Sequence, residues 1–261
     1  MGQSIGHKER VQAQFGASGD AYVVSPGHAA GDDLEQLVAW VEGGPEKAAL
    51  DVATGGGHTA LAIAPYYGRV VASDLTERML QSAEAFIRGK GATNVEFRRA
   101  DAERLPFADG EFDLVTCRIA PHHFGNVAAF VAEVARVLKP EGIFLLEDTV
   151  VPDDPVLGDF MNRADKLRDD THVRSLPARE WREMLAAAGL AVEDERAFRK
   201  THPFQAWLAR ARTPEPARAE VAALLRDAPP AARQAFTIEL DPDGRIASYT
   251  DTKVVLRARK S

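Results

Sequence analysis

From residue 48 onward, short apolar runs alternate with longer segments in which apolar residues recur every three or four positions. The runs predict strands at 48–53, 69–73, 94–98, 112–117 and 142–147. The periodic segments predict helices near 59–64, 76–87 and 127–138. Apolar strands separated by amphipathic helices are typical of a parallel sheet covered on both faces. The pattern therefore predicts an α/β fold that binds its ligand at the carboxyl ends of the strands.

The alternation is less regular at the two ends of the chain. Near the start, Asp32 or Asp33 is expected to cap a helix that runs to residue 40. After residue 150 the pattern predicts helices at 153–170 and 177–188, a strand at 190–200, a proline-divided helical stretch at 204–235, and a hairpin of 236–240 with 246–258. Four segments result: an N-terminal helical segment 1–44, a core 45–200, a helical insertion 201–235, and a terminal hairpin 236–261 that completes the core sheet.

Three glycines, Gly55 to Gly57, stand between the first predicted strand and the first helix. Glycine lets the backbone approach a ligand closely, and the helix N-terminus behind it offers unpaired N–H groups. The run Gly55-x-Gly57-x-x-Ala60, with Asp74 farther on, also fits a relaxed dinucleotide-binding pattern. Against that reading, Asp51 lies inside the strand, where a dinucleotide-binding strand is apolar. A buried carboxylate needs a partner, such as a ligand amino group or the N–H groups of the turn.

The run Asp51-Val52-Ala53-Thr54-Gly55-Gly56-Gly57 resembles the Asp-x-Gly-x-Gly-x-Gly turn of class I S-adenosylmethionine-dependent methyltransferases. The resemblance is greatest to the small-molecule group that includes ubiquinone and menaquinone biosynthesis enzymes. It departs from the family at Ala53, which is harmless if its φ is negative. The resemblance implies a Rossmann-like, seven-stranded, mostly parallel sheet whose last strand, at 253–259, is antiparallel and lies beside the sixth. It also implies that the N-terminal segment forms a lid.

The same resemblance assigns a cofactor site for S-adenosylmethionine. Asp74 is expected to accept hydrogen bonds from both ribose hydroxyls, and Asp101-Ala102 to bind the adenine ring. The full expected set is Asp51, Ala53, Thr54, Gly55, Gly57, Asp74, Leu75, Asp101, Ala102 and Arg118. From the residues alone, the alternatives are that Asp74 is a helix-capping residue and Asp101 a turn residue.

The acceptor side is expected after the fourth strand, where the chain continues as Cys117-Arg118-Ile119-Ala120-Pro121-His122-His123-Phe124. Histidine is the residue type best suited to proton transfer near neutral pH, so either His122 or His123 is expected to remove a proton from the acceptor, with Asp148 to orient it. The alternative is that one histidine packs or caps while the other is solvated. Arg118 pairs either with a carboxylate of the ligand or with Glu147 or Asp148. Tyr22, His28 and Phe124 are the expected acceptor-binding residues.

Composition narrows the class of partner. The formal net charge is −7 and the pI is near 5.6, so no general electrostatic attraction to nucleic acid or anionic membranes is expected. Cys117 is the only cysteine, and no apolar run is long enough to span a bilayer, so a cytoplasmic protein is expected. The histidines lack zinc-ligand spacing, so no metal is expected. The expected partner is a small-molecule methyl acceptor, and the expected state is a monomer or homodimer.

The sequence therefore predicts methyl transfer from S-adenosylmethionine to a small molecule, with release of S-adenosylhomocysteine. Three alternatives stay open: a nicotinamide-dependent oxidoreductase, a non-catalytic S-adenosylmethionine-binding protein, and an RNA or protein methyltransferase. The identity of the acceptor and of the methylated atom is not specified by the residues.

Overall fold

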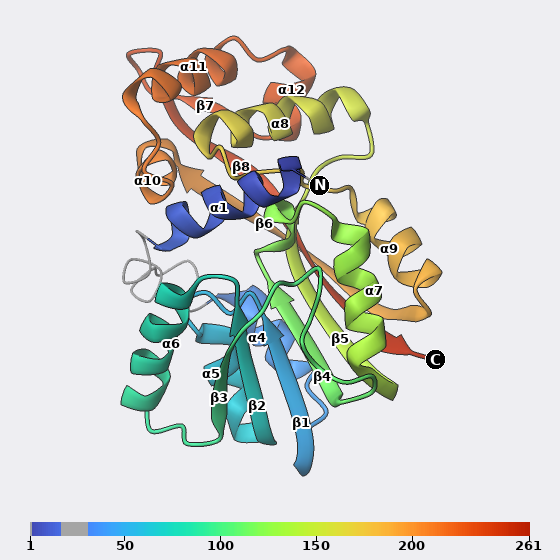
Figure 1. Cartoon of the computed structure of the whole chain (residues 1–261). Helices are drawn as coiled ribbons and strands as arrows, with labels where there is room; N and C mark the ends of the chain where they lie inside the picture. Colours follow the sequence, from blue (N-terminus) through green and yellow to red (C-terminus); the bar gives the residue numbers. More distant parts are fainter. Residues whose placement is uncertain (1, 17–30) are drawn as a thin grey trace. The chain divides into compact units, whose positions relative to one another are not determined.

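A computed structural model describes residues 2–16 and 31–261 (Figure 1). The chain forms two compact units. The first contains residues 1–148, 182–196 and 255–261, and the second contains 149–181 and 197–254. The expected helical insertion, 201–235, lies wholly in the second unit, together with 149–181.

Among the described residues the sheet has eight strands, and seven of them follow the order β3-β2-β1-β4-β5-β8-β6. Their bounds are β1 Gly44–Val52, β2 Tyr67–Asp74, β3 Val95–Arg99, β4 Phe112–Arg118, β5 Leu138–Val150, β6 Leu190–Pro203 and β8 Ile246–Lys260. The pairs β1/β2, β2/β3, β1/β4 and β4/β5 are parallel. Strand order reverses between β1 and β4, which is where such sheets bind ligands. As expected, the last strand lies beside β6, and the predicted α/β architecture is confirmed.

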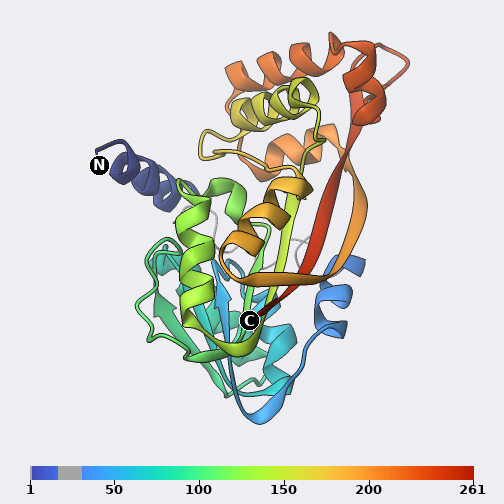
Figure 2. The same cartoon turned by 90° about the vertical axis from the view of Figure 1, so that its right-hand side faces the viewer.

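Helices bury the strands on both faces of the sheet. Figure 2 shows α7 (Val127–Val137) on one side of the sheet and α4 (Asp32–Ala39) on the other. α6 (Glu77–Gly89) packs through Met79, Leu80, Ala83 and Ile87, which are one helical stripe. The other helices that the first unit contains in whole or in part are α1 Gly2–Gly16, α5 His58–Ile63, η1 Ala64–Tyr66, η2 Pro121–His123 and α9 Ala178–Ala187.

Two strands begin earlier than their hydrophobic patterns predict. β1 starts at Gly44, before the predicted start at residue 48, and its pairing with β2 shifts between Gly44 and Ala48. β5 starts at Leu138, directly after α7, and its pairing with β4 is interrupted before Ile143. Both stretches contain proline, glycine and charged residues, which do not form the apolar pattern that predicts a strand. Backbone pairing still occurs there.

Predicted helix caps differ from the observed ones. The N-cap of α4 is Gly31, and Asp33 is a buried residue of the first helical turn. Thr76 is the N-cap of α6 by position, but its side chain makes no capping hydrogen bond. Instead, Asp74 Oδ1 accepts from the Thr76 backbone N–H at 2.9 Å. The Asp74 carboxylate thus ties the backbone at the start of α6 to the end of β2.

The second unit contains α8 (Pro155–Arg168), α10 (Phe204–Arg210), α11 (Glu215–Arg226) and α12 (Pro230–Ala235). The two-residue strand β7 (Glu239–Leu240) pairs antiparallel with β8 and completes the predicted hairpin. The core of this unit includes Met161, Phe204, Trp207, Val221, Leu225, Phe236 and Tyr249. Phe204 and Trp207 are therefore core residues.

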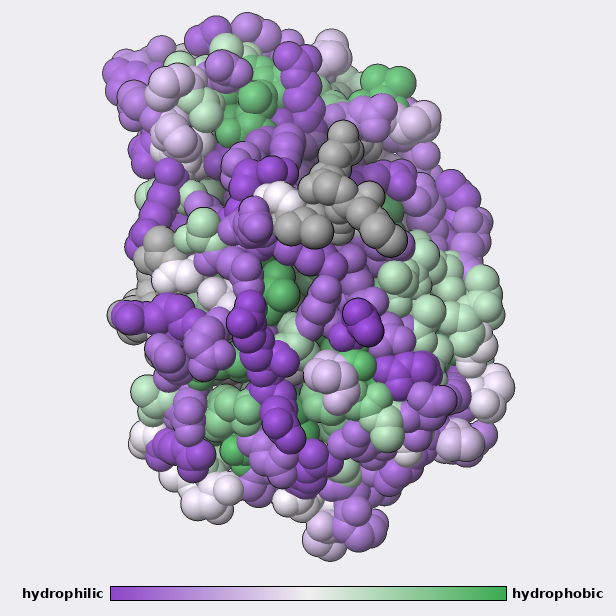
Figure 3. Space-filling view, in the orientation of Figure 1, coloured by the Kyte–Doolittle hydropathy of each residue, from purple (hydrophilic) through white to green (hydrophobic). Residues whose placement is uncertain are grey.

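Hydrophilic residues dominate the face shown in Figure 3, in keeping with the charged composition. Within residues 2–16 and 31–261, no helix has the length and apolar character needed to cross a membrane.

Candidate functional site

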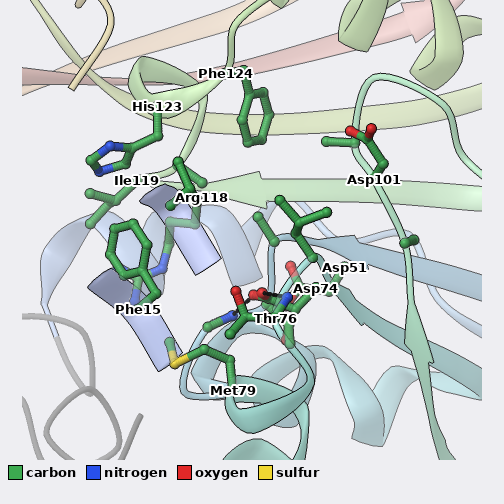
Figure 4. A pocket seen from close by; sticks show the side chains of 18 of the residues that line it. Phe15, Asp51, Asp74, Thr76, Met79, Asp101, Arg118, Ile119, His123 and Phe124 are labelled. Carbon is green, nitrogen blue, oxygen red and sulfur yellow. Dashed lines mark hydrogen bonds between the residues drawn. The ribbon is translucent and has the colours of Figure 1, made fainter. Parts of the chain in front are cut away.

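A cavity lies in the first unit, among residues at the carboxyl ends of β1, β2 and β4 and in the loop after β3 (Figure 4). Its volume is about 1050 Å³, including space open to solvent. Eleven of the predicted site residues line it: Asp51, Ala53, Thr54, Gly55, Asp74, Leu75, Asp101, Ala102, Arg118, His123 and Phe124. Residues that are far apart in the sequence are thus brought to one cavity at the switch point of the sheet.

Asp51 is a buried carboxylate within β1 and is only 1% exposed. Its two oxygens accept from the hydroxyls of Thr54 and Thr116, both at 2.6 Å. Burial raises the pKa of Asp51 to about 6, although the two hydroxyls and the positive charge of Arg118 lower it. Burial still outweighs these contacts, so the site is suited to a ligand that brings positive charge.

The glycine turn combines left-handed backbone with close packing. Ala53 has a φ of 53°, so the condition under which alanine is harmless is not met. A left-handed conformation costs an alanine about 1–2 kcal/mol. Gly55 is also left-handed, with a φ of 55°. Gly57 does not line the cavity; a Cβ there would lie 2.8 Å from Ile87 Cδ1, so this glycine allows α5 to pack closely against α6.

Asp74 ends β2 and joins the turn to the start of α6. Its Oδ2 accepts from the Gly55 N–H at 3.1 Å and its Oδ1 from the Thr76 N–H. Burial raises the pKa of Asp74, while these N–H groups lower it. The residue both organises the turn and faces the cavity, so the two interpretations of it are not exclusive.

Arg118 is held by groups on three elements. Its Nε donates to Thr59 Oγ1 at 3.1 Å, and its Nη1 lies 3.5 Å from Asp33 Oδ2 and 3.4 Å from Glu147 Oε2. The pairing with Glu147 was one of the two predicted alternatives, whereas Asp33 was not foreseen as a partner. Its guanidinium is thus buried among protein carboxylates and also contributes to the cavity wall.

The two neighbouring histidines have different surroundings. His122 Nδ1 donates to Asp148 Oδ1 at 2.6 Å, and this aspartate is 1% exposed. Neither of these two residues lines the cavity. His123 does, and its ring packs edge-on against Phe15 at 5.0 Å. The two histidine rings are 4.3 Å apart, so the His122–Asp148 pair lies directly beside the cavity wall.

The helix α1 contributes a face that the sequence reasoning missed. His7, Lys8, Val11 and Phe15 all line the cavity. Their spacing places them on one side of a helix, which was the available signal, but the hydrophobic pattern of α1 is too weak to identify that side. Lys8 forms an ion pair with Asp101 at 2.6 Å. Figure 4 shows Phe15, Ile119 and His123 grouped on one side of the cavity, with Asp101 on the other.

Ile119 adds conformational strain to the same wall. Its φ is 54°, which is a rare conformation for a β-branched residue. Its N–H donates to the Glu147 carbonyl at 2.7 Å, which fixes the turn. Strain of this kind persists where the surrounding structure enforces it, and it is concentrated at ligand sites.

Tyr22 and His28 fall outside the described residues. Cys117 is a buried strand residue, and burial raises the pKa of its thiol. Within the described ranges, no group of three or more His, Cys, Asp or Glu side chains is arranged to hold a metal ion.

Residues 50–146 match the model of a family described as a methyltransferase domain. The uncharacterized methyltransferase YcgJ of Bacillus subtilis is 37% identical over 249 residues, which cover 95% of this chain and 98% of that protein. Its crystal structure matches with a TM-score of 0.85 at 38% identity, over 87% of this chain and 97% of that one.

Two further similarities concern other bacteria. The crystal structure of a putative methyltransferase, BH2331, from Bacillus halodurans is 41% identical, with a TM-score of 0.85 over 88% of this chain and 99% of that one. The demethylmenaquinone methyltransferase of Chlorobaculum parvum is 37% identical over 118 residues, which cover 45% of this chain and 47% of that protein. The second similarity is thus confined to less than half of each chain.

Proposed function

Because the chain belongs to the family of class I S-adenosylmethionine-dependent methyltransferases, we propose that it binds S-adenosylmethionine in this cavity and methylates a small molecule. The observation that carries the proposal is the gathering of Asp51, Asp74 and Asp101 around one cavity. Each comes from a different strand end, and together they offer three separate points of attachment to one elongated ligand.

The chemistry of these carboxylates fits that ligand. The negative charge of Asp51 is buried and is not fully compensated by the protein. The ammonium group of the ligand would balance it. Asp74, at the end of β2, would accept hydrogen bonds from the ribose hydroxyls, and Asp101 from the adenine amino group. The backbone of Gly55, which lines the cavity, would allow close approach at the methionine end.

Bound S-adenosylmethionine would supply an activated methyl group on a positively charged sulfur. The protein then has to hold the acceptor in line with that group and exclude water, and positioning of this kind contributes up to about 7–11 kcal/mol. Phe15, Ile119 and Phe124 give the cavity apolar walls suited to both tasks.

For an acceptor that must lose a proton, the two histidines provide the basic group. His123 faces the cavity, whereas Asp148 fixes His122 with its proton on Nδ1 and leaves Nε2 as the basic atom. Replacing His123 by Ala is expected to lower turnover more than the affinity for S-adenosylhomocysteine. Equal losses in the two measurements would exclude a role toward the acceptor.

A small-molecule acceptor is supported by the size of the cavity and by the acidic composition, which does not favour nucleic acid. A monomer or homodimer and a cytoplasmic location remain predictions.

Calorimetric titration with S-adenosylhomocysteine tests the cofactor assignment directly. The wild-type protein is expected to bind it, and Asp74→Ala to lose about 1.5–3 kcal/mol, the usual contribution of hydrogen bonds to a charged group. Asp194→Asn, which changes an exposed carboxylate of β6, is the matched control. Binding of NADH in place of S-adenosylhomocysteine would overturn the proposal and indicate an oxidoreductase.

A further inference from the structure

Lys8 on α1 is bonded to two carboxylates in the loop that follows β3. Its Nζ lies 2.6 Å from Asp101 Oδ2 and 2.8 Å from Glu103 Oε2. The three side chains are 24%, 32% and 12% exposed, so the cluster is partly shielded from water. All three residues line the cavity. An ion pair therefore joins α1 to the part of the wall expected to receive the adenine ring.

The same carboxylates are built into the loop. Asp101 Oδ1 accepts from the Glu103 N–H at 3.0 Å, and Glu103 Oε1 accepts from the Asn126 N–H at 3.0 Å. Asn126 is in turn the N-cap of α7. The partners of Lys8 are thus held in place by the backbone of the first unit, which gives α1 a fixed anchor point.

Two uncharged contacts attach α1 to neighbouring loops. His7 Nε2 donates to the His123 carbonyl at 2.8 Å, and Gln12 Nε2 donates to the Leu75 carbonyl at 3.1 Å. Together with Lys8, they connect α1 to the loops that follow β2, β3 and β4. The helix cannot leave the cavity wall without breaking bonds to all three.

We propose that Lys8 is an electrostatic latch that keeps α1 closed over the cavity and thereby sets the rate at which a ligand enters and leaves. The latch itself follows from the ion pairs; its effect on S-adenosylhomocysteine release rests on the proposed function. Bonds between ionised partners are stronger than those that His7 and Gln12 make, and salt weakens them. Without Lys8, the carboxylates of Asp101 and Glu103 also lose the cation between them.

Hydrogen–deuterium exchange on the ligand-free protein tests the latch. Lys8→Met is expected to speed amide exchange across α1 by about three- to tenfold, the range for two partly exposed ion pairs. Lys8→Arg should restore most of the protection. Lys90→Met, which removes an exposed lysine at the end of α6, is the matched control. Its amide exchange across α1 should equal that of the wild type.

Salt gives an independent readout. Raising the NaCl concentration from about 0.05 to 0.5 M should speed exchange of α1 in the wild type and leave Lys8→Met nearly unchanged, because only the wild type has the ion pair to screen. Equal exchange of α1 in the wild type and Lys8→Met, or equal salt dependence, overturns the proposal.

Release of radiolabelled S-adenosylhomocysteine, followed by rapid filtration, tests the consequence for the ligand. Lys8→Met should release it about three- to tenfold faster than the wild type and Lys8→Arg. If the release rate is unchanged, Lys8 does not control how fast the ligand enters and leaves the cavity. A wild-type protein that binds no S-adenosylhomocysteine contradicts the proposed function instead, and the exchange of α1 then decides the latch alone.

Discussion

Asp51 shows how a single buried carboxylate in the wall of the cavity can lower folding stability. Its pKa is about 6 in the folded protein, against an ordinary value of 3.8. As the pH rises from about 4 to 6, the unfolded chain therefore loses this proton before the folded chain does. The free energy of unfolding falls over that range, and the difference of about two pKa units corresponds to about 3 kcal/mol.

Asp51→Asn is therefore expected to stabilise the ligand-free protein at neutral pH. The neutral amide keeps hydrogen-bonding capacity toward Thr54 and Thr116 without a buried charge. Calorimetry at pH 7.5 should show a Tm raised by roughly 5–10 °C, and a smaller gain at pH 5. Asp194→Asn serves as the exposed control. A variant destabilised equally at both pH values would show that the charge on Asp51 is not what limits stability.

At the scale of secondary-structure elements, a buried polar cluster joins β6, α10 and β8 in the second unit. His202 Nε2 donates to Asp251 Oδ2 at 2.9 Å, and Arg210 donates to His202 Nδ1 at 3.0 Å. This arrangement requires a neutral imidazole, because a proton on Nδ1 would face the guanidinium. Burial lowers the pKa of His202, and the charges of Lys253 and Arg210 act in the same direction, whereas Asp251 raises it.

The sign of the pH effect follows from this lowered pKa. Between the ordinary value of 6.5 and the lower folded value, the unfolded chain binds a proton that the folded chain does not. His202 therefore lowers stability as the pH falls below about 6.5. Asp251, whose pKa lies below 3.8, does not contribute to the pH dependence of stability until more acidic pH.

His202→Gln is expected to remove this part of the acid sensitivity. Urea unfolding at pH 7.5 and pH 5 can be followed by tryptophan fluorescence, since Trp207 packs against Tyr249 in the same unit. The wild type should lose more stability than the variant between the two values. Asp51 titrates in both proteins and cancels in the difference. If the variant loses as much stability as the wild type between pH 7.5 and pH 5, His202 is not the source of this acid sensitivity.

Periodicity located the main elements because most helices and central strands bury regular stripes of apolar residues. It failed at the start of β1 and β5, where backbone pairing continues through glycine, proline and charged residues. In the site, Asp51, Asp74 and Asp101 were detectable as polar residues at strand ends. Lys8 was not, because a lysine on a polar helix carries no signal of its partner. The left-handed φ of Ala53 likewise depends on contacts made only in the fold.

At the scale of the whole molecule, neither compact unit is a continuous stretch of chain. The chain passes between them after residues 148, 181, 196 and 254. The cavity nevertheless lies entirely within the first unit, because all the residues that line it lie between positions 7 and 125. The cavity and the buried polar cluster of His202 thus belong to different units.

This separation predicts where a ligand stabilises the protein. At 100 times its Kd, S-adenosylhomocysteine should add about 2.7 kcal/mol to any opening that destroys the cavity. Hydrogen–deuterium exchange should therefore slow in α1, β1, β2 and β4, whereas local opening of α11 in the second unit should keep its rate. Asp74→Ala at the same ligand concentration is the control and should show less protection. Equal protection of α11 and β1 would mean that the two units open only together, so that the cavity reports on the stability of the entire chain.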